Sequence, residues 1–136
     1  MSNLIDFGFK SPVKTNNISL IENFKGDKLD IMMKMQKELQ EKLAVKKFGK
    51  LEFNQEYINN NMIALVDELF EALRETPFKY WKKNQQLNIE AARKEAIDSF
   101  HFFMNFLIGL GIDSEMLYKM YCEKNKINHD RIKEGY

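Results

Sequence analysis

Residues 95–110 read EAIDSFHFFMNFLIGL, and the helix that this stretch predicts is apolar on nearly every side. Between Ala96 and Leu110 only four residues are polar: Asp98, Ser99, His101 and Asn105. A helix that is hydrophobic all round is buried within its assembly. We therefore expect residues 88–110 to form the central helix of a helical domain, with Asn88 as its N-cap.

Two carboxylates of this helix share one face. Glu95 and Asp98 are three residues apart and Asn105 continues the stripe, so Asp98 is expected to point into protein. An ionised carboxylate there is costly unless it pairs with a base or binds a metal. Glu68 and Glu71 repeat the spacing upstream, and two facing pairs would make an oxygen cage suited to Mg²⁺. Two alternatives stay open: salt bridges from Lys or Arg, and a solvated acidic face on the upstream helix.

Apolar periodicity predicts three more helices. The first spans about 28–46, the second runs from 54 or 55 to 75, and the last runs from its N-cap Asp113 to about residue 126, with a polar tail after it. The core face of the second helix is expected to hold Ile58, Met62, Leu65, Val66, Leu69 and Leu73. Alternating β-branched runs and repeats are absent from the sequence, which therefore predicts an all-α bundle of four or more helices.

Length and composition narrow the class of protein. The chain has 136 residues, 44% hydrophobic and 30% charged, which suits one globular domain at 28–136 behind an irregular arm at 1–27. Lys and Arg number 21 against 20 Asp and Glu, so the charge gives no reason to expect nucleic acid as a partner. The single cysteine, Cys122, is expected to be a buried packing residue and fits a reducing compartment. With no signal-like apolar core and no stretch long enough to span a membrane, we expect a cytoplasmic protein.

The two acidic pairs form the motifs E-x-x-E and E-x-x-D, separated by residues 72–94. This arrangement resembles that of the all-α nucleoside triphosphate pyrophosphohydrolases, the MazG-like superfamily. Three blocks are similar to the dimeric, all-α dUTPase branch: DELFEALRETPFKYWKK (67–83), EAIDSFHFF (95–103) and KNKINHDRIKEGY (124–136). The chain departs from that branch in being short, without the larger insertions that close the base pocket, and the arm at 1–27 has no counterpart.

The resemblance implies roles for the acidic pairs. Glu68, Glu71, Glu95 and Asp98 match the family's Mg²⁺ ligands, which hold two or more ions, with Mn²⁺ as a substitute. In the family a glutamate of the first motif helps to deprotonate the attacking water. Glu68 is the first candidate for that role here, and Glu71 is the second.

The resemblance also implies residues that bind the nucleotide. Gln36 matches the glutamine that recognises the base, and its amide offers both a donor and an acceptor to a uracil edge. Trp81 is expected to cover the base or close the pocket, with ordinary packing as the alternative, and Asn105 to contact the sugar. His101 is expected to hydrogen-bond within the protein rather than to bind the metal, because Mg²⁺ favours oxygen. The phosphate-binding candidates are Lys124, Asn128, Arg131 and Tyr136, with Lys79 and Lys82.

These matches imply a homodimer that hydrolyses dUTP to dUMP and pyrophosphate with Mg²⁺. This reaction would remove dUTP from the nucleotide pool and supply the precursor of dTMP. One alternative keeps the chemistry and changes the base, as in a dCTPase or a MazG-like house-cleaning enzyme. A second alternative is a non-enzymatic helical interaction protein whose carboxylates are neutralised by salt bridges.

Overall fold

The computed structural model describes residues 24–135, and within this range every regular element is an α-helix. The helices are α2 (Lys28–Phe48), α3 (Gln55–Arg74), α4 (Ile89–Gly109) and α5 (Ser114–Lys133). The all-α prediction is therefore confirmed, and α2, α3 and α4 begin and end within two residues of their predicted bounds. The arm expected at 1–27 lies mostly outside the described residues.

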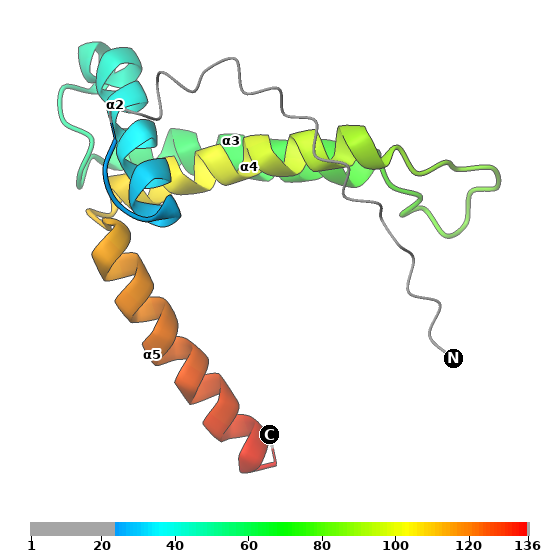
Figure 1. The fold of residues 1–136 in the computed structure, drawn as a ribbon. Helices are drawn as coiled ribbons and strands as arrows, with labels where there is room; N and C mark the ends of the chain where they lie inside the picture. The colour runs from blue at the N-terminus through cyan, green and yellow to red at the C-terminus, as the bar shows by residue number, and fades with distance from the viewer. Residues whose placement is uncertain (1–23, 136) are drawn as a thin grey trace.

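α3 and α4 form a long antiparallel hairpin, and the two helices lie side by side along their length (Figure 1). The connection between them lies at one end of this hairpin, and α2 crosses the other end (Figure 1). α5 starts at the end that α2 crosses, packs against α2 and then leaves the hairpin (Figure 1). Among the described helices, none is long and apolar enough to cross a membrane.

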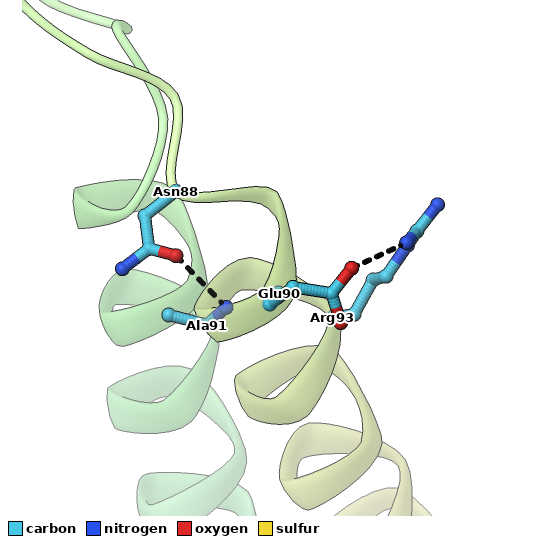
Figure 2. Close-up of polar contacts among 4 residues, drawn as sticks. All are labelled: Asn88, Glu90, Ala91 and Arg93. Atoms are coloured by element: carbon cyan, nitrogen blue, oxygen red, sulfur yellow. Dashed lines mark hydrogen bonds and ion pairs between the residues drawn. The ribbon is translucent and has the colours of Figure 1, made fainter. Parts of the chain in front are cut away.

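Short polar side chains fix where the helices begin. Asn54 Oδ1 accepts a hydrogen bond from the backbone N–H of Tyr57 at 3.0 Å, and Asp113 Oδ1 does the same for Met116 at 2.8 Å. At the start of α4, Asn88 Oδ1 accepts from the N–H of Ala91 at 3.3 Å (Figure 2). Each cap satisfies a backbone donor that the first turn of a helix leaves without a partner. The predicted N-caps at Asn88 and Asp113 are confirmed.

The apolar core sits where α2 crosses the hairpin. Among residues 24–135 Tyr57 is the most deeply buried large side chain, and its ring meets that of Phe48 edge to face at 5.4 Å between centroids. Gly109 lets α3 and α4 approach closely here, because a Cβ at this position would lie 2.8 Å from Ile58 Cγ1. The buried apolar residues are Met33, Ala44, Leu51, Tyr57, Met104, Leu107 and Ile108.

The predicted core face of α3 is wrong for most of its residues within one chain. Ile58 and Leu65 are partly buried, as expected for a core face. The other four residues of that face are exposed: Met62, Val66, Leu69 and Leu73. The apolar stripe that periodicity assigned to the interior therefore faces outward.

α5 also differs from its prediction. It continues to Lys133 instead of ending near residue 126, and Asp130 pairs with Lys126 at 2.8 Å and with Lys133 at 4.0 Å along the extra turns. Such pairs one turn apart support a polar helix. Cys122 is exposed rather than buried, because no residue of α5 is buried in the single chain.

Candidate active site

α3 turns two of its acidic residues, Glu68 and Glu71, towards α4. The less exposed positions of α3 recur every three or four residues and pass from Tyr57 and Asn61, near the crossing with α2, to Glu68, Glu71 and Glu75 nearer the connection. This is the spacing of one helix face. The acidic face is only partly covered, since Glu68 is partly buried and the Glu71 side chain is 44% exposed, and the apolar stripe is the side left uncovered.

Three carboxylates meet across the hairpin. Oxygen atoms of Glu68, Glu71 and Glu95 all lie within 4.8 Å of one another. Burial raises the pKa of Glu68 above its ordinary value, and the negative charges of Glu71, Asp98 and Glu95 raise it further. Asp98 lies outside the group of three but close enough for its charge to act on Glu68. The predicted stripe of Glu95, Asp98 and Asn105 on α4 is confirmed as a partly or fully buried face.

This donor set fits a hard divalent cation. Carboxylate oxygens are the ligands that Mg²⁺ and Mn²⁺ take in proteins. Burial is the largest cause of the raised pKa of Glu68, and the negative charges of Glu71, Asp98 and Glu95, which raise it further, are what a bound cation would offset. An ion pair joins Arg74 Nη2 to Glu71 Oε1 at 3.7 Å, with both side chains about half exposed. An exposed pair of this length contributes little, so it does not offset the cost of bringing the carboxylates together.

The repulsion predicts a pH-dependent gain in stability for Glu68→Gln. Without divalent cations at pH 7, the free energy of unfolding should rise by about 0.5 kcal/mol, since like charges one helical turn apart cost roughly 0.2–0.5 kcal/mol per pair. A carboxyl group whose pKa is raised by folding destabilises the folded state when it is ionised. The gain should therefore be present above that raised pKa and vanish as the pH falls below 4.5, the ordinary value. Urea denaturation across this pH range measures it.

A matched control for this measurement is Glu41→Gln on α2, which also removes one negative charge from an exposed helical position. Glu41→Gln should change the free energy of unfolding little at pH 7. That small change should not vary with pH in the way expected for Glu68→Gln. If Glu68→Gln lowers the stability of the metal-free protein at pH 7, the carboxylates are not repelling one another.

Gln36 and Asn105, which are expected to contact the base and the sugar, belong to a buried chain of hydrogen-bonded amides. Gln36 Nε2 donates to Asn105 Oδ1 at 2.7 Å, and Asn105 Nδ2 donates to Asn61 Oδ1 at 2.9 Å. The Nδ1 atom of His101 lies 2.8 Å from Gln36 Oε1, so the expectation that this histidine is hydrogen-bonded within the protein is confirmed. The chain joins α2, α3 and α4 at one point. Whether Gln36 and Asn105 contact base and sugar stays a prediction.

Asn61 is the member of this chain that the sequence analysis missed. It is buried on α3, and its Nδ2 donates to the backbone carbonyl oxygen of Tyr57 at 2.8 Å. Its position seven residues before Glu68 on the same helix face could have indicated it. The signal is hidden because Asn61 ends a run of three asparagines, 59–61, of which the first two are exposed.

The predicted phosphate-binding residues lie on two other parts of the chain. Lys124, Asn128 and Arg131 are exposed on α5, which leads away from the hairpin that carries the carboxylates (Figure 1). Within one chain the structure does not bring them to the acidic cluster. Tyr136 lies outside the described residues.

The connection between α3 and α4 carries the remaining candidates, Lys79, Trp81 and Lys82. Gln85 ties this loop together by donating to the backbone carbonyl oxygens of Lys79 and Lys82. Asn88 N–H donates to the carbonyl oxygen of Glu75 at 2.9 Å and closes the loop. Trp81 is 67% exposed and meets Tyr80 edge to face, so its ring is available to a ligand or to another chain.

Three phage proteins are similar to part of the chain. The chain is 37% identical over 71 residues to a dCTP pyrophosphatase of Enterobacteria phage T4, with 41% of this chain and 42% of that protein covered. It is 45% identical over 58 residues to a dCTP pyrophosphatase of Enterobacteria phage LZ5, with 40% and 34% covered. A DNA replication protein of phage T4 is 36% identical over 61 residues, with 34% of this chain and 16% of that protein covered. The chain thus spans less than half the length of each of these relatives, and no solved structure matches it.

The family comparison covers more of the chain than these relatives do. A family model described as dUTPase matches residues 28–116, which include α2, α3 and α4 with all four acidic residues and the buried amides, and which end before the basic block of α5. The resemblance inferred from the acidic motifs is therefore confirmed, and the chain belongs to the all-α dUTPase family.

Proposed function

We propose that the protein hydrolyses a pyrimidine deoxynucleoside triphosphate, dUTP in the first place, to the monophosphate and pyrophosphate with the help of Mg²⁺. The observation that carries this proposal is the cluster of Glu68, Glu71 and Glu95 oxygens within a family match at residues 28–116. dCTP is the second candidate substrate, and it is favoured by the two phage relatives that are named dCTP pyrophosphatase.

The carboxylates have two tasks in this proposal. Glu71, Glu95 and Asp98, together with Glu68, hold the cation. When bound, Mg²⁺ supplies positive charge that stabilises the charge developing on the phosphate oxygens. Glu68 is the proposed base that takes a proton from the attacking water, with Glu71 as the second choice. Glu68 is supported by its position, since one of its oxygens lies within 4.8 Å of oxygens of Glu71 and Glu95, and a cation held there would keep its carboxylate ionised and able to accept a proton.

A homodimer is part of the proposal. A large apolar area is uncovered in the single chain, along the outer stripe of α3 and along α5. Apolar patches on this scale mark interaction surfaces rather than ordinary monomer surface. We take a second copy of the chain as the partner, because α5 leads away from the hairpin of its own chain, and the α5 of a second copy would be free to bring its basic residues to the acidic site (Figure 1). Lys124 and Arg131 are the residues proposed to bind phosphate from there.

A nucleotide panel tests the proposed reaction. Purified full-length protein is incubated with each deoxynucleoside triphosphate, with and without Mg²⁺, and the products are separated. Formation of dUMP and pyrophosphate that depends on Mg²⁺ supports the first candidate, and a preference for dCTP moves the proposal to the second. A non-enzymatic interaction protein would release no product and would gain no stability from Mg²⁺ with a non-hydrolysable dUTP analogue, whereas a binding protein gains about 2.7 kcal/mol when the ligand is at roughly 100 times its Kd.

Gln36→Ala should reduce the preference between bases more than it reduces turnover of the best substrate. Removing the amide takes away the donor and acceptor that recognise a pyrimidine edge, so the ratio of kcat/KM values across the panel should fall by about tenfold. The matched control is Gln40→Ala, one turn further along α2. Gln40 is also buried and accepts a hydrogen bond from the Tyr57 hydroxyl at 3.0 Å, but it is not part of the chain that contains Asn105. A preference that shifts equally in both variants would argue against base recognition by Gln36.

A further inference from the structure

The buried amides form a hydrogen-bonded chain with two different ends. At one end is the backbone carbonyl oxygen of Tyr57, which accepts from Asn61 Nδ2 at 2.8 Å. The chain continues through Asn105 to Gln36 and finishes at the ring of His101. Asn61, Asn105 and Gln36 are each no more than 7% exposed, whereas His101 is an exposed residue. The chain thus has a closed end and an end that solvent can reach.

The closed end sets the direction of every bond. A backbone carbonyl can only accept, so Asn61 must turn its Nδ2 towards Tyr57 and its Oδ1 towards Asn105. Asn105 must then present Nδ2 to that oxygen, which leaves its Oδ1 for Gln36 Nε2. Gln36 Oε1 is left to face His101, and because a carboxamide oxygen cannot donate, His101 Nδ1 must carry the proton. If any one carboxamide group of the chain were rotated by half a turn, its oxygen would face another oxygen atom.

We propose that Asn61 and Asn105 are positioning residues that hold the amide of Gln36 with Oε1 towards His101, the end of the chain that solvent can reach. At this end the oxygen selects a pyrimidine edge that donates an N–H. The inference rests on the proposed function, which places the base at Gln36. An amide oxygen has two lone pairs, and His101 uses one of them, so a second donor can be accepted. The ligand class is a pyrimidine with a hydrogen on N3, as in uracil, or with a 4-amino group, as in cytosine. A 2-pyrimidinone base has neither donor and is expected to be rejected.

The tautomer of His101 tests the direction of the chain without any turnover. The full-length protein is labelled with ¹⁵N-histidine, and its ring nitrogens are observed by NMR at alkaline pH, roughly 8 or above. His101 should carry its proton on Nδ1 and have a bare Nε2. The chain has only one other histidine, His129, which is exposed on α5 and serves as an internal reference.

Asn61→Leu removes the anchor at Tyr57 while keeping a side chain of similar volume. The carboxamide of Gln36 can then rotate by half a turn, and a substantial fraction of His101 should shift to the form protonated on Nε2. The matched control is Asn60→Leu, because Asn60 Nδ2 donates to the carbonyl oxygen of Glu56 at 2.8 Å with the same geometry but is exposed and outside the chain. If Asn61→Leu does not fold, Asn61→Ser replaces it, since a hydroxyl can donate or accept and gives the chain no fixed direction.

Base selection is measured with three substrates: dUTP, dCTP and the deoxynucleoside triphosphate of 2-pyrimidinone. Asn61→Leu should lower discrimination against the 2-pyrimidinone nucleotide by about tenfold, mainly through KM, whereas Asn60→Leu should leave it unchanged. A wild-type His101 protonated on Nε2, a tautomer that Asn61→Leu does not alter, or an unchanged discrimination would each overturn the inference. Failure of the wild type to hydrolyse any nucleotide would instead refute the proposed function, and the tautomer measurement would still decide the positioning.

Discussion

Replacing Glu95 with glutamine should lower the turnover of dUTP by about 10³-fold or more while the protein remains folded. One oxygen of Glu95 lies within 4.8 Å of oxygens of Glu68 and Glu71, so the substitution removes one of the three charges that the proposed cation would contact. Stabilising charge on a phosphoryl group contributes several kcal/mol, and each 1.36 kcal/mol corresponds to about a tenfold change in rate. Glutamine keeps the shape of the side chain and relieves repulsion in the cluster, so no loss of stability is expected. Steady-state kinetics and circular dichroism together measure both effects.

The control for this experiment is Glu90→Gln on the same helix. Glu90 is exposed, its Oε1 pairs with Arg93 Nη1 at 2.8 Å, and it stands at the first turn of α4 (Figure 2). This variant should keep nearly full turnover, because the pair is a surface ion pair of small energy. Asp98→Asn is a third variant for the same assay. Asp98 lies outside the group formed by Glu68, Glu71 and Glu95, but its negative charge raises the pKa of Glu68. Normal turnover in Glu95→Gln would refute the metal assignment.

The sequence predicted the inner face of α4 well, although the helix is not buried on every side in the single chain, where Ile97 and Phe103 are exposed. Its stretch of apolar residues permits few solvated faces, and the polar residues that interrupt it, Asp98 and Asn105, fall on one stripe with Glu95. Their inward position follows from helical geometry alone, and the structure confirms it. The three helix starts at Asn54, Asn88 and Asp113 follow from equally local chemistry.

α3 was harder to predict because periodicity reports only that a face is apolar. Val66 and Leu73 lie on such a face, and a core and an interface with another molecule give the same pattern. The apolar stripe was assigned to the core, which left a solvated face as one alternative for Glu68 and Glu71 beside the predicted metal cage. Asn61 was missed for a related reason: its burial depends on a partner on another helix, Asn105, and no local pattern shows such a partner.

Phe70→Glu should convert a dimer of this chain into monomers and lower turnover with it. Phe70 is 54% exposed on the outer stripe of α3, next to Val66 and beside the face that carries the carboxylates. Burying a phenylalanine in an interface contributes about 1.5–3 kcal/mol, and a glutamate in its place would in addition leave a buried charge without a partner. In a symmetric dimer both copies carry the change, so the loss counts twice. Sedimentation equilibrium measures the dissociation. Asn59→Glu, an equal change of charge at an exposed polar position of α3, should leave the dimer intact.

Mixing two inactive variants then shows whether the second copy completes the site. Glu95→Gln disables the carboxylate cluster, and Arg131→Ala disables α5, which leads away from the cluster of its own chain (Figure 1). If α5 acts on its partner, a mixed dimer holds one intact site, made of the carboxylates of the Arg131→Ala chain and the α5 of the Glu95→Gln chain. Random exchange of subunits gives half mixed dimers, so about one quarter of the wild-type activity should return. If α5 serves its own chain, every site in the mixed dimer keeps one lesion and no activity returns. The recovery therefore distinguishes a shared site from a dimer that only buries apolar surface.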